Sequence, residues 1–408
     1  MSGGVIASGS RRPLLLKLRV RLLSLLANDR WQWKRAVPIR ELEVVERATL
    51  LPASEGVSLS VRRILDDARA TDERDLRTEF PPVRRHVVRD AWLDPQSSSI
   101  VVGGSHVLSD WAFDRLEDGR IKGAGILIHD GRRVLHRLPR RPSVIDRGVQ
   151  LTGSHSQNWY HWVAEILPKV TLVGALEHRA RDWPLLIPES VTRYPTYLAA
   201  LETLCPDHEI IVVPGAAPVL VKELLVLDGL VLHTPGFAPG SLPRHDTELI
   251  NVDGMRRFRA RLLEGLGVMP QVEPGLRLFI DRHHDPERTY NREELLKISA
   301  EHGFQPVVGG DLTLKEQAEL FARAELVIGP NGAGWTNILF AAQGCRGLCW
   351  LVPNGFGGPW FRNLGLVAGA EMRYLEAEPR SEGNPLTVDY WVDPDRFRQA
   401  LSTLVAGW

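Results

Sequence analysis

Short apolar segments alternate with amphipathic ones from residue 276 to residue 405, and this alternation limits the possible folds more than any other feature of the chain. The apolar segments are RLFIDR, QPVVGG, ELVIGP, GLCWLVP and MRYLEA, and amphipathic stretches such as NREELLKISAEHG and TLKEQAELFARA lie between some of them. Short strands that are apolar along their length are typical of parallel sheets, which need helical crossovers. The pattern predicts a doubly wound α/β domain over residues 271–408.

A related pattern precedes this domain. Residues 83–149 contain short β-branched runs bounded by Gly, Asp and Ser, which are typical of an antiparallel meander. The segments PLLIPE, YPTYLAALETLC, EIIVVPG and VKELLVLDGL predict further strands and a helix, and a long amphipathic helix is expected from Thr247 to Leu266. The segment GVMPQVEPG has the composition of a linker. With 408 residues available, we expect residues 81–270 and 271–408 to form two facing α/β halves with a ligand cleft between them.

The first 80 residues differ from both halves. Residues 11–40 hold nine Lys or Arg and one acidic residue, with leucines at helical spacing, and a charged linker follows up to Pro81. A basic amphipathic helix of this kind either lies in the headgroup layer of an anionic membrane or docks on the protein's own surface. No run of eighteen apolar residues predicts a membrane span.

Composition excludes some classes of function. The 50 Lys and Arg balance the 50 Asp and Glu, which argues against broad nucleic-acid binding. Three cysteines without a CxxC pair suit buried thiols in a reducing compartment. Because basic residues interrupt the first leucine-rich segment, it does not resemble a secretory signal, and we expect a cytoplasmic protein.

The segment ELVIGPNGAGWTN is the first candidate binding motif. An apolar strand is expected to end at Pro330, and a helix to begin near Gly332. Backbone amides at a helix N-terminus attract phosphate, and Gly332, Ala333 and Gly334 allow it to come close. A tight turn without a ligand explains the same glycines.

Arg282 is the second candidate, because it follows the first strand of the C-terminal half. Its guanidinium could hold a diphosphate, or it could pair with Asp281 or Asp285 at the surface. Asn291 is expected to cap the next helix. The neighbouring HHD triplet offers metal-ligand types, but adjacent side chains point apart, and the chain's one Asp-x-Asp, at residues 393–395, suits the cap of the last helix. We therefore expect no metal.

The third candidate is SQNWYHWVAEILP, residues 156–168. On a helix starting near Asn158, His161 and Glu165 share a face, and a carboxylate beside an imidazole fixes its tautomer and prepares it as a general base. A core histidine held by a neighbouring acid beneath Trp159 and Trp162 is the alternative.

These motifs, in this order, resemble glycosyltransferase family 61. The matching residues are Asn158 to Trp162 with Leu167-Pro168, then Arg282 with the segment 291–294, and then Gly329 to Asn337 with Phe340. The resemblance implies a GT-B architecture of two facing Rossmann-like domains and inverting sugar transfer from a nucleotide-sugar donor, with no obligatory metal or other cofactor. It also implies a glycan or lipid-linked acceptor in surface (capsular) polysaccharide assembly at the inner leaflet of a bacterial membrane.

The resemblance also assigns roles to residues. It implies His161 as the base with Glu165 as its orienter, and Asn158, Trp159 and Trp162 on the acceptor side. It places the donor diphosphate on Arg282 and the turn formed by Asn331, Gly332, Ala333, Gly334 and Asn337. A non-catalytic nucleotide-sugar or glycan-binding protein of the same fold remains an alternative. A dehydrogenase is a weaker one, because GxGxxG with a downstream acid is missing.

Overall fold

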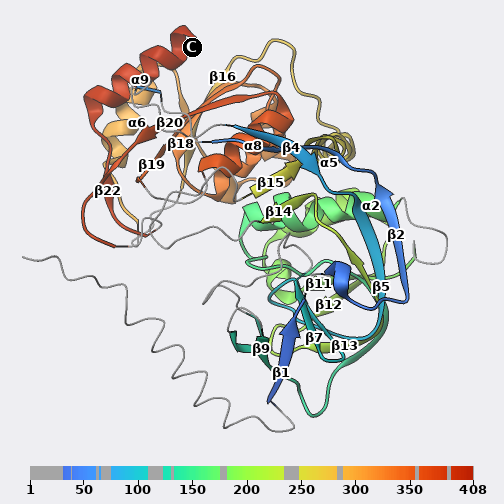
Figure 1. The fold of residues 1–408 in the computed structure, drawn as a ribbon. Helices are drawn as coiled ribbons and strands as arrows, with labels where there is room; N and C mark the ends of the chain where they lie inside the picture. The colour runs from blue at the N-terminus through green and yellow to red at the C-terminus, as the bar shows by residue number, and fades with distance from the viewer. Residues whose placement is uncertain are drawn as a thin grey trace, which may run out of the picture.

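The computed structural model describes residues 31–37, 39–60, 64–65, 75–108, 123–129, 133–174, 182–233, 248–282, 288–353, 358–383 and 387–407. The N-terminal part of the chain builds a large mixed sheet and the C-terminal part a smaller parallel one (Figure 1). The expectation of a mixed α/β protein is thus confirmed. Residues 11–30 of the predicted basic helix and the HHD triplet lie outside the described residues.

The C-terminal sheet is entirely parallel, as the sequence predicts. Its order is β17-β16-β18-β19-β20. The strands are β16 (Leu276–Asp281), β17 (Gln305–Val308), β18 (Ala324–Pro330), β19 (Arg346–Leu351) and β20 (Glu371–Glu376). Because the chain leaves β16 toward one side and later continues on the other, the carboxyl ends of β16 and β18 flank the crevice where such sheets bind ligands.

Helices cover both faces of this sheet. The helices are α6 (Arg292–Glu301), α7 (Leu314–Ala322), the 3-10 helix η7 (Ala333–Phe340), α8 (Gly358–Ala368) and α9 (Pro394–Ala406). On β18, Leu326 and Ile328 pack in one core with side chains of α6 and α9, whereas Val327 packs in the other with α7, η7 and α8. This alternation follows from the two-residue period of a strand, and it explains why these strands are apolar throughout. Two short segments complete this part, η6 (Gly309–Asp311) and the ribbon of β21 (Glu378–Pro379) and β22 (Tyr390–Trp391).

The N-terminal sheet joins a parallel part to an antiparallel meander. Its order is β12-β11-β10-β13-β5-β6-β7-β1-β9-β8, with β2 paired to β5. The strands are β1 (Trp31–Ala36), β2 (Glu46–Leu51), β5 (Val83–Leu93), β6 (Ser99–Val102), β7 (Ser105–Leu108), β8 (Ile126–His129), β9 (Arg133–Arg137), β10 (Val144–Gln150), β11 (Leu185–Pro188), β12 (Ile210–Val213) and β13 (Val219–Leu227). Strands β10 to β13 are mutually parallel where they pair. The meander predicted for residues 83–149 is confirmed only in part: β5-β6-β7 and β8-β9 are antiparallel, but β1 lies between β7 and β9, parallel to β7, and β10 pairs in parallel with β11 and β13.

A second, four-stranded antiparallel sheet was not predicted. Its order is β14-β15-β3-β4, and its strands are β3 (Ser54–Ser58), β4 (Leu76–Phe80), β14 (Val231–His233) and β15 (Glu248–Asn251). The prediction of a basic helix and linker for residues 1–80 is therefore wrong where the structure describes strands β1 to β4. The helix predicted from Thr247 begins at Val252 instead, because residues 248–251 pair with β3 and β14.

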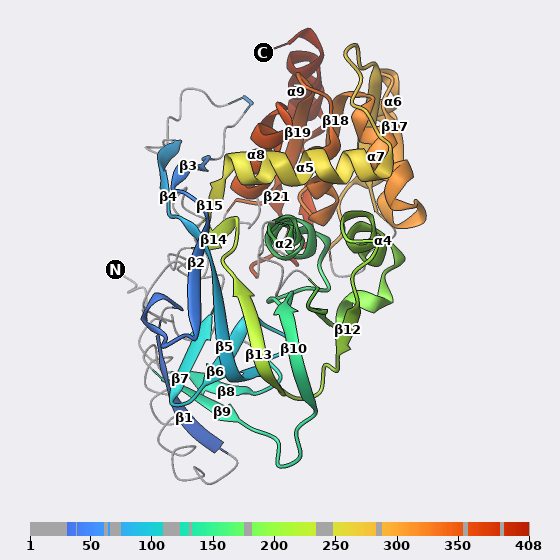
Figure 2. The same cartoon turned by 90° about the vertical axis from the view of Figure 1, so that its right-hand side faces the viewer.

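Helix α5 (Val252–Leu266) connects the two parts of the molecule. It runs between the C-terminal helices and the N-terminal helices α2 (Val170–Val173) and α4 (Pro195–Leu204) (Figure 2). Its Arg259 donates to the carbonyls of Leu339 and Ala341 at 2.6 and 2.7 Å, so it caps the end of η7. One hydrophobic core continues from β3 through α5 to β20, so both parts share buried apolar surface.

The short helices of the N-terminal part are η1 (Ile39–Glu41), η2 (His161–Ile166), η3 (Leu167–Lys169) and η4 (Glu189–Arg193). In the described ranges, no helix has both the length and the apolar character needed to cross a lipid bilayer.

Candidate functional site

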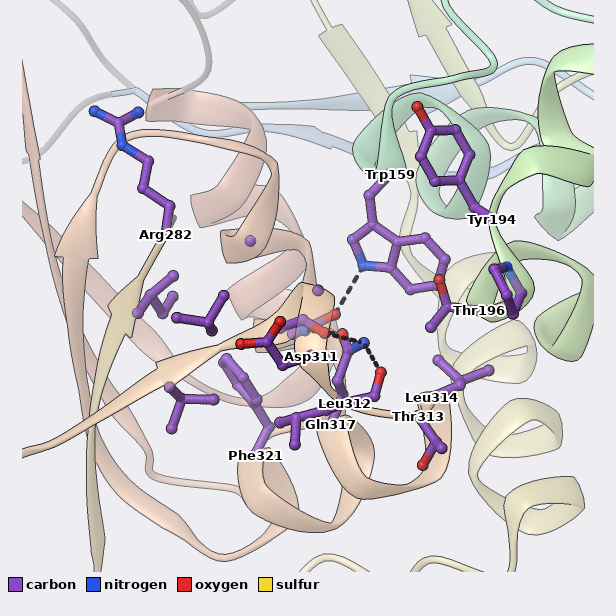
Figure 3. A pocket seen from close by; sticks show the side chains of 18 of the residues that line it. Trp159, Tyr194, Thr196, Arg282, Asp311, Leu312, Thr313, Leu314, Gln317 and Phe321 are labelled. Atoms are coloured by element: carbon purple, nitrogen blue, oxygen red, sulfur yellow. Dashed lines mark hydrogen bonds between the residues drawn. The ribbon is translucent and has the colours of Figure 1, made fainter. Parts of the chain in front are cut away.

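A pocket of about 700 Å³ lies at the carboxyl edge of the parallel sheet (Figure 3). One side consists of the end of β16 up to Arg282, residues 307–314, and Gly334 and Asn337 from the β18–η7 connection. The other side comes from the N-terminal part, through Trp159 and residues 194–197. The volume suits a small organic ligand, and the position is the one at which open α/β sheets bind ligands.

Aromatic rings form the N-terminal wall of the pocket. The Tyr194 ring stacks on Tyr197 at 4.6 Å between centroids, and Tyr197 lies 5.0 Å from Trp159. Tyr194 is 40% exposed, whereas Trp159 is buried and donates its indole N–H to Asn337 Oδ1 at 2.8 Å. Trp159 therefore lines the pocket, as expected for an acceptor-side residue, and its contact with a sugar stays a prediction.

Two other predicted acceptor residues have structural roles. Trp162 has no exposed surface and donates to the Tyr197 carbonyl at 3.1 Å, so the prediction of a sugar platform at Trp162 is wrong: its ring is in the core. Asn158 is exposed, but its side-chain oxygen accepts the Tyr160 N–H at 2.9 Å, which caps the start of the helical turn.

The glycine-rich turn after β18 is held from beneath. The buried Trp335 donates its indole N–H to the Pro330 carbonyl at 3.1 Å. A β-carbon on Gly334 would lie 2.9 Å from Ile280 Cγ2, so this glycine permits close packing. Gly332 differs, because the nearest atom to such a β-carbon is Arg288 Nη2, at 3.8 Å. Packing thus explains one glycine, and Gly332 leaves room for a ligand.

Not every predicted donor residue reaches the pocket. Gly334 and Asn337 line it, whereas Asn331, Gly332 and Ala333 lie at the turn beside it. The Asn337 amide is held between Trp159 and Gln317 Oε1, the latter at 2.7 Å. In this structure Asn337 therefore connects the pocket walls, and its contact with a diphosphate stays a prediction. The expected α-helix after the turn is a 3-10 helix with Gly332 at its N-cap.

Two arginines lie near this turn, of which one was predicted. Arg282 lines the pocket (Figure 3). It donates to the Arg288 carbonyl at 2.7 Å and lies 5.6 Å from the Tyr290 ring centroid. Arg288 approaches the Asn331 carbonyl at 3.4 Å. Sequence reasoning missed Arg288, although a second arginine in the loop after Arg282 was the available signal. Together they bring two guanidinium groups to the sheet edge.

Asp281 does not pair with the Arg282 side chain. It forms an ion pair with Arg292 instead and accepts the Arg282 backbone N–H at 2.9 Å. Asn291 stands at the N-cap of α6 but accepts no backbone N–H of the helix: its amide bonds the Val392 backbone at 2.9 and 3.0 Å and donates to the Glu294 side chain at 2.9 Å. The expected capping interaction of Asn291 is therefore wrong.

The predicted pair of His161 and Glu165 is present. His161 Nδ1 lies 2.9 Å from both carboxylate oxygens of Glu165, and the carboxylate is buried while the imidazole is 20% exposed. These residues are in a π-helix, in which the Leu167 N–H donates to the Trp162 carbonyl, and the following Pro168 has no N–H to continue a regular ladder. Because a carboxylate accepts hydrogen bonds, Nδ1 carries the proton and donates it to Glu165. The other ring nitrogen, Nε2, is then unprotonated and can accept a proton.

The C-terminal part reaches this pair and the preceding Tyr160 through helix α8. Trp360 of α8 stacks on Tyr160 at 5.4 Å and lies 6.3 Å from the His161 ring. The Tyr160 hydroxyl donates to Glu248 at 2.5 Å, and Asn363 of α8 donates to the same carboxylate at 3.1 Å. Burial, together with the charge of Glu248, raises the pKa of Tyr160 well above its usual value, so the hydroxyl stays protonated as a donor.

Metal and thiol chemistry have few candidates. Among the residues that the structure describes, no three His, Cys, Asp or Glu side chains form a group that could hold a metal ion, and metal independence stays a prediction. Asp393 accepts the N–H groups of Asp395 and Arg396 at 2.9 Å, which confirms that this Asp-x-Asp caps α9. The three cysteines are buried free thiols, as expected.

One family model matches the middle of the chain. Residues 159–348, just under half of the chain, match the family model Glycosyltransferase 61. The match covers every predicted site residue except Asn158. A search of curated proteins found no match. The resemblance drawn from the sequence is thus confirmed: residues 159–348 form a glycosyltransferase 61 region, and the chain is a glycosyltransferase.

Proposed function

We propose that the chain is an inverting, metal-independent glycosyltransferase that transfers a sugar from a nucleotide-sugar donor to a glycan or lipid-linked acceptor. One observation carries the proposal. The pocket at the carboxyl edge of the parallel sheet is lined on one side by Arg282 and on the other by Trp159, two residues before the pair of His161 and Glu165. The segment that carries the potential base thus supplies part of the pocket wall, although the imidazole itself is not among the lining side chains.

We assign the donor to the C-terminal part, in a GT-B-like arrangement with the acceptor on the N-terminal side. When the anomeric bond breaks, negative charge grows on the departing nucleoside diphosphate. The guanidinium groups of Arg282 and Arg288 and the backbone at Asn331 to Gly334 can stabilise this charge. The open space beside Gly332 favours this placement.

We assign the base to His161. Glu165 accepts the Nδ1 proton, so Nε2 can take the proton from the attacking acceptor hydroxyl. Attack on the face opposite the leaving group forms the new glycosidic bond as the old one breaks, which inverts the anomeric carbon. Trp159, and not Trp162, is the residue to which we assign contact with a sugar ring.

We place this activity in surface polysaccharide assembly in the cytoplasm, with peripheral contact to the inner leaflet through the basic segment 11–30, since residues 31–36 belong to strand β1. Six Lys or Arg against one Asp in that segment suit an anionic lipid surface.

The test separates catalysis from binding. His161→Ala is expected to lower kcat by a factor of about 100 to 10,000, the usual contribution of a general base, while affinity for the nucleoside diphosphate stays within about threefold of wild type. His302→Ala, at the end of α6, is the control and should retain activity.

Calorimetry with UDP, GDP, CDP and CMP identifies the donor nucleotide. Wild-type turnover by His161→Ala would refute the base assignment. Nucleotide binding without transfer to any acceptor in wild type would favour the non-catalytic binding protein, and tight NAD binding with none of these nucleotides would favour a dehydrogenase.

A further inference from the structure

Three buried side chains form a continuous hydrogen-bonded chain across the floor of the pocket (Figure 3). Trp159 Nε1 donates to Asn337 Oδ1 at 2.8 Å, and Asn337 Nδ2 donates to Gln317 Oε1 at 2.7 Å. Gln317 Nε2 then donates to the carbonyls of Gly309 and Leu312, at 2.8 and 3.1 Å. All five residues line the pocket.

The direction of this chain is fixed by chemistry. An indole N–H can only donate, and a backbone carbonyl can only accept, so both ends of the chain are determined. Each amide between them must accept on the Trp159 side and donate on the loop side. A reversal of either amide would set two donors or two acceptors against each other in a buried site, which is costly.

The chain joins elements that are far apart in sequence. Trp159 directly precedes the turn that carries His161, Asn337 is in η7, and Gln317 is in α7. The two carbonyl groups belong to the connection between β17 and α7, which forms the pocket wall opposite Trp159 (Figure 3). A ligand that restrains the position of this wall therefore also restrains, through these hydrogen bonds, the segment that bears the proposed base.

We propose that Asn337 and Gln317 are positioning residues, which set the pocket wall at residues 309–312 and couple it to the His161 turn through Trp159. The proposal rests on the proposed function in one respect: it takes the nucleotide-sugar donor as the ligand of the pocket. Neither amide takes part in the chemical step.

The first experiment needs no ligand. Gln317→Met keeps the length of the side chain and removes both bonds to the loop, so amide exchange in residues 309–314 should rise at least about tenfold. Trp159→Phe removes the indole N–H at the other end of the hydrogen-bonded chain, together with one ring of the buried side chain, and it should raise exchange in the same residues. Gln399→Met, at an exposed position on α9, is the control and should leave the exchange in residues 309–314 unchanged.

The second experiment measures transfer. Gln317→Met should raise KM for the donor about tenfold, because it releases the pocket wall. It should change kcat less than about threefold, because Tyr160 still attaches the His161 turn to Glu248 and Trp360. Gln317→Glu, which can still accept from Asn337 but has lost its donor, should do the same. The Trp159→Phe and Gln317→Met double variant should raise KM for the donor by less than the product of the two single effects, because either change breaks the same hydrogen-bonded chain.

The outcomes separate this inference from the proposed function. Unchanged exchange in residues 309–314 in Gln317→Met, or fully additive effects in the double variant, would overturn the positioning role. If wild type binds no nucleoside diphosphate, the proposed function fails, while the exchange measurements still decide whether the chain sets the pocket wall.

Discussion

Removing the Tyr160 hydroxyl should destabilise the protein although the ring stays in place. Tyr160→Phe deletes the donor that lies 2.5 Å from the buried carboxylate of Glu248 and leaves Asn363 as a donor at 3.1 Å. A hydrogen bond to a buried charged group contributes about 1.5 to 3 kcal/mol, so we expect a loss of about 2.5 kcal/mol. An unfolding entropy of about 2.1 cal/mol/K per residue over 408 residues converts this into a fall in Tm of about 3 °C.

Scanning calorimetry at constant pH resolves a shift of this size. Tyr194→Phe is the matched control, because Tyr194 is 40% exposed, and its change should stay within about 0.5 °C. A shift below about 1 °C for Tyr160→Phe would refute the reasoning, since Glu248 would then not depend on that donor. Trp360 remains stacked on the ring in the variant, so loss of packing would not account for a large shift.

Three further predictions concern other parts of the chain. Burial, with a smaller effect of Lys34, lowers the pKa of His136 to about 4 from 6.5, so stability should fall as the pH drops below 6.5, by about 2 kcal/mol at pH 5. His136→Gln should remove that part of the pH dependence of Tm, and equal slopes would contradict it. Gly334→Ala should lower stability by about 1 to 2 kcal/mol through contact with Ile280, whereas Gly332→Ala should retain Tm and weaken nucleotide binding in calorimetry. Equal effects of the two glycine changes would refute this difference. The buried cysteines should resist a thiol reagent at pH 8 until the protein is denatured, because burial raises the pKa of Cys205 to about 11 and that of Cys345 to about 12. A thiol that reacts in the native protein would count against this prediction.

The parallel sheet could be predicted because its strands are buried on both faces. Val327 and Leu326 contact different cores, so the strand is apolar without interruption and its period is visible in the sequence. Strands β1 to β4 gave no such signal. β2 exposes several of its residues. β3 pairs with β15, about 190 residues later in the chain, and β4 pairs with β3. Propensity alone carries no information about such distant pairing.

Helix α8 was missed for a related reason. Its sequence GPWFRNLGLVA begins with Gly and Pro and contains another Gly, which are poor helix formers. Tertiary contacts compensate. Arg362 pairs with Asp75 and donates to the Ser60 carbonyl at 2.8 Å, while the Asn363 side chain accepts the Leu59 N–H at 2.8 Å. The charged segment before Pro81, which was predicted as a linker, thus binds α8, whose Trp360 lies beside His161.

The candidate site was predictable where the spacing is local. His161 and Glu165 are four residues apart, and helical geometry brings them together. Gln317 gave no local signal, because its importance arises from a pocket wall that other segments supply. The same limit applies to the two tryptophans: stacking and core packing use the same residue type, and only the fold separates Trp159 at the pocket from Trp162 in the core.

The aromatic residues before His161 join the two parts of the molecule around the proposed base. Trp159 bonds η7 through Asn337, and the next residue, Tyr160, bonds Glu248 and stacks on α8. Two adjacent side chains thus reach two different helices of the C-terminal part, and His161 follows directly after them. A general base must be held within a fraction of an ångström of its productive position. This double attachment can hold His161 in place more firmly than packing of one apolar helix face would.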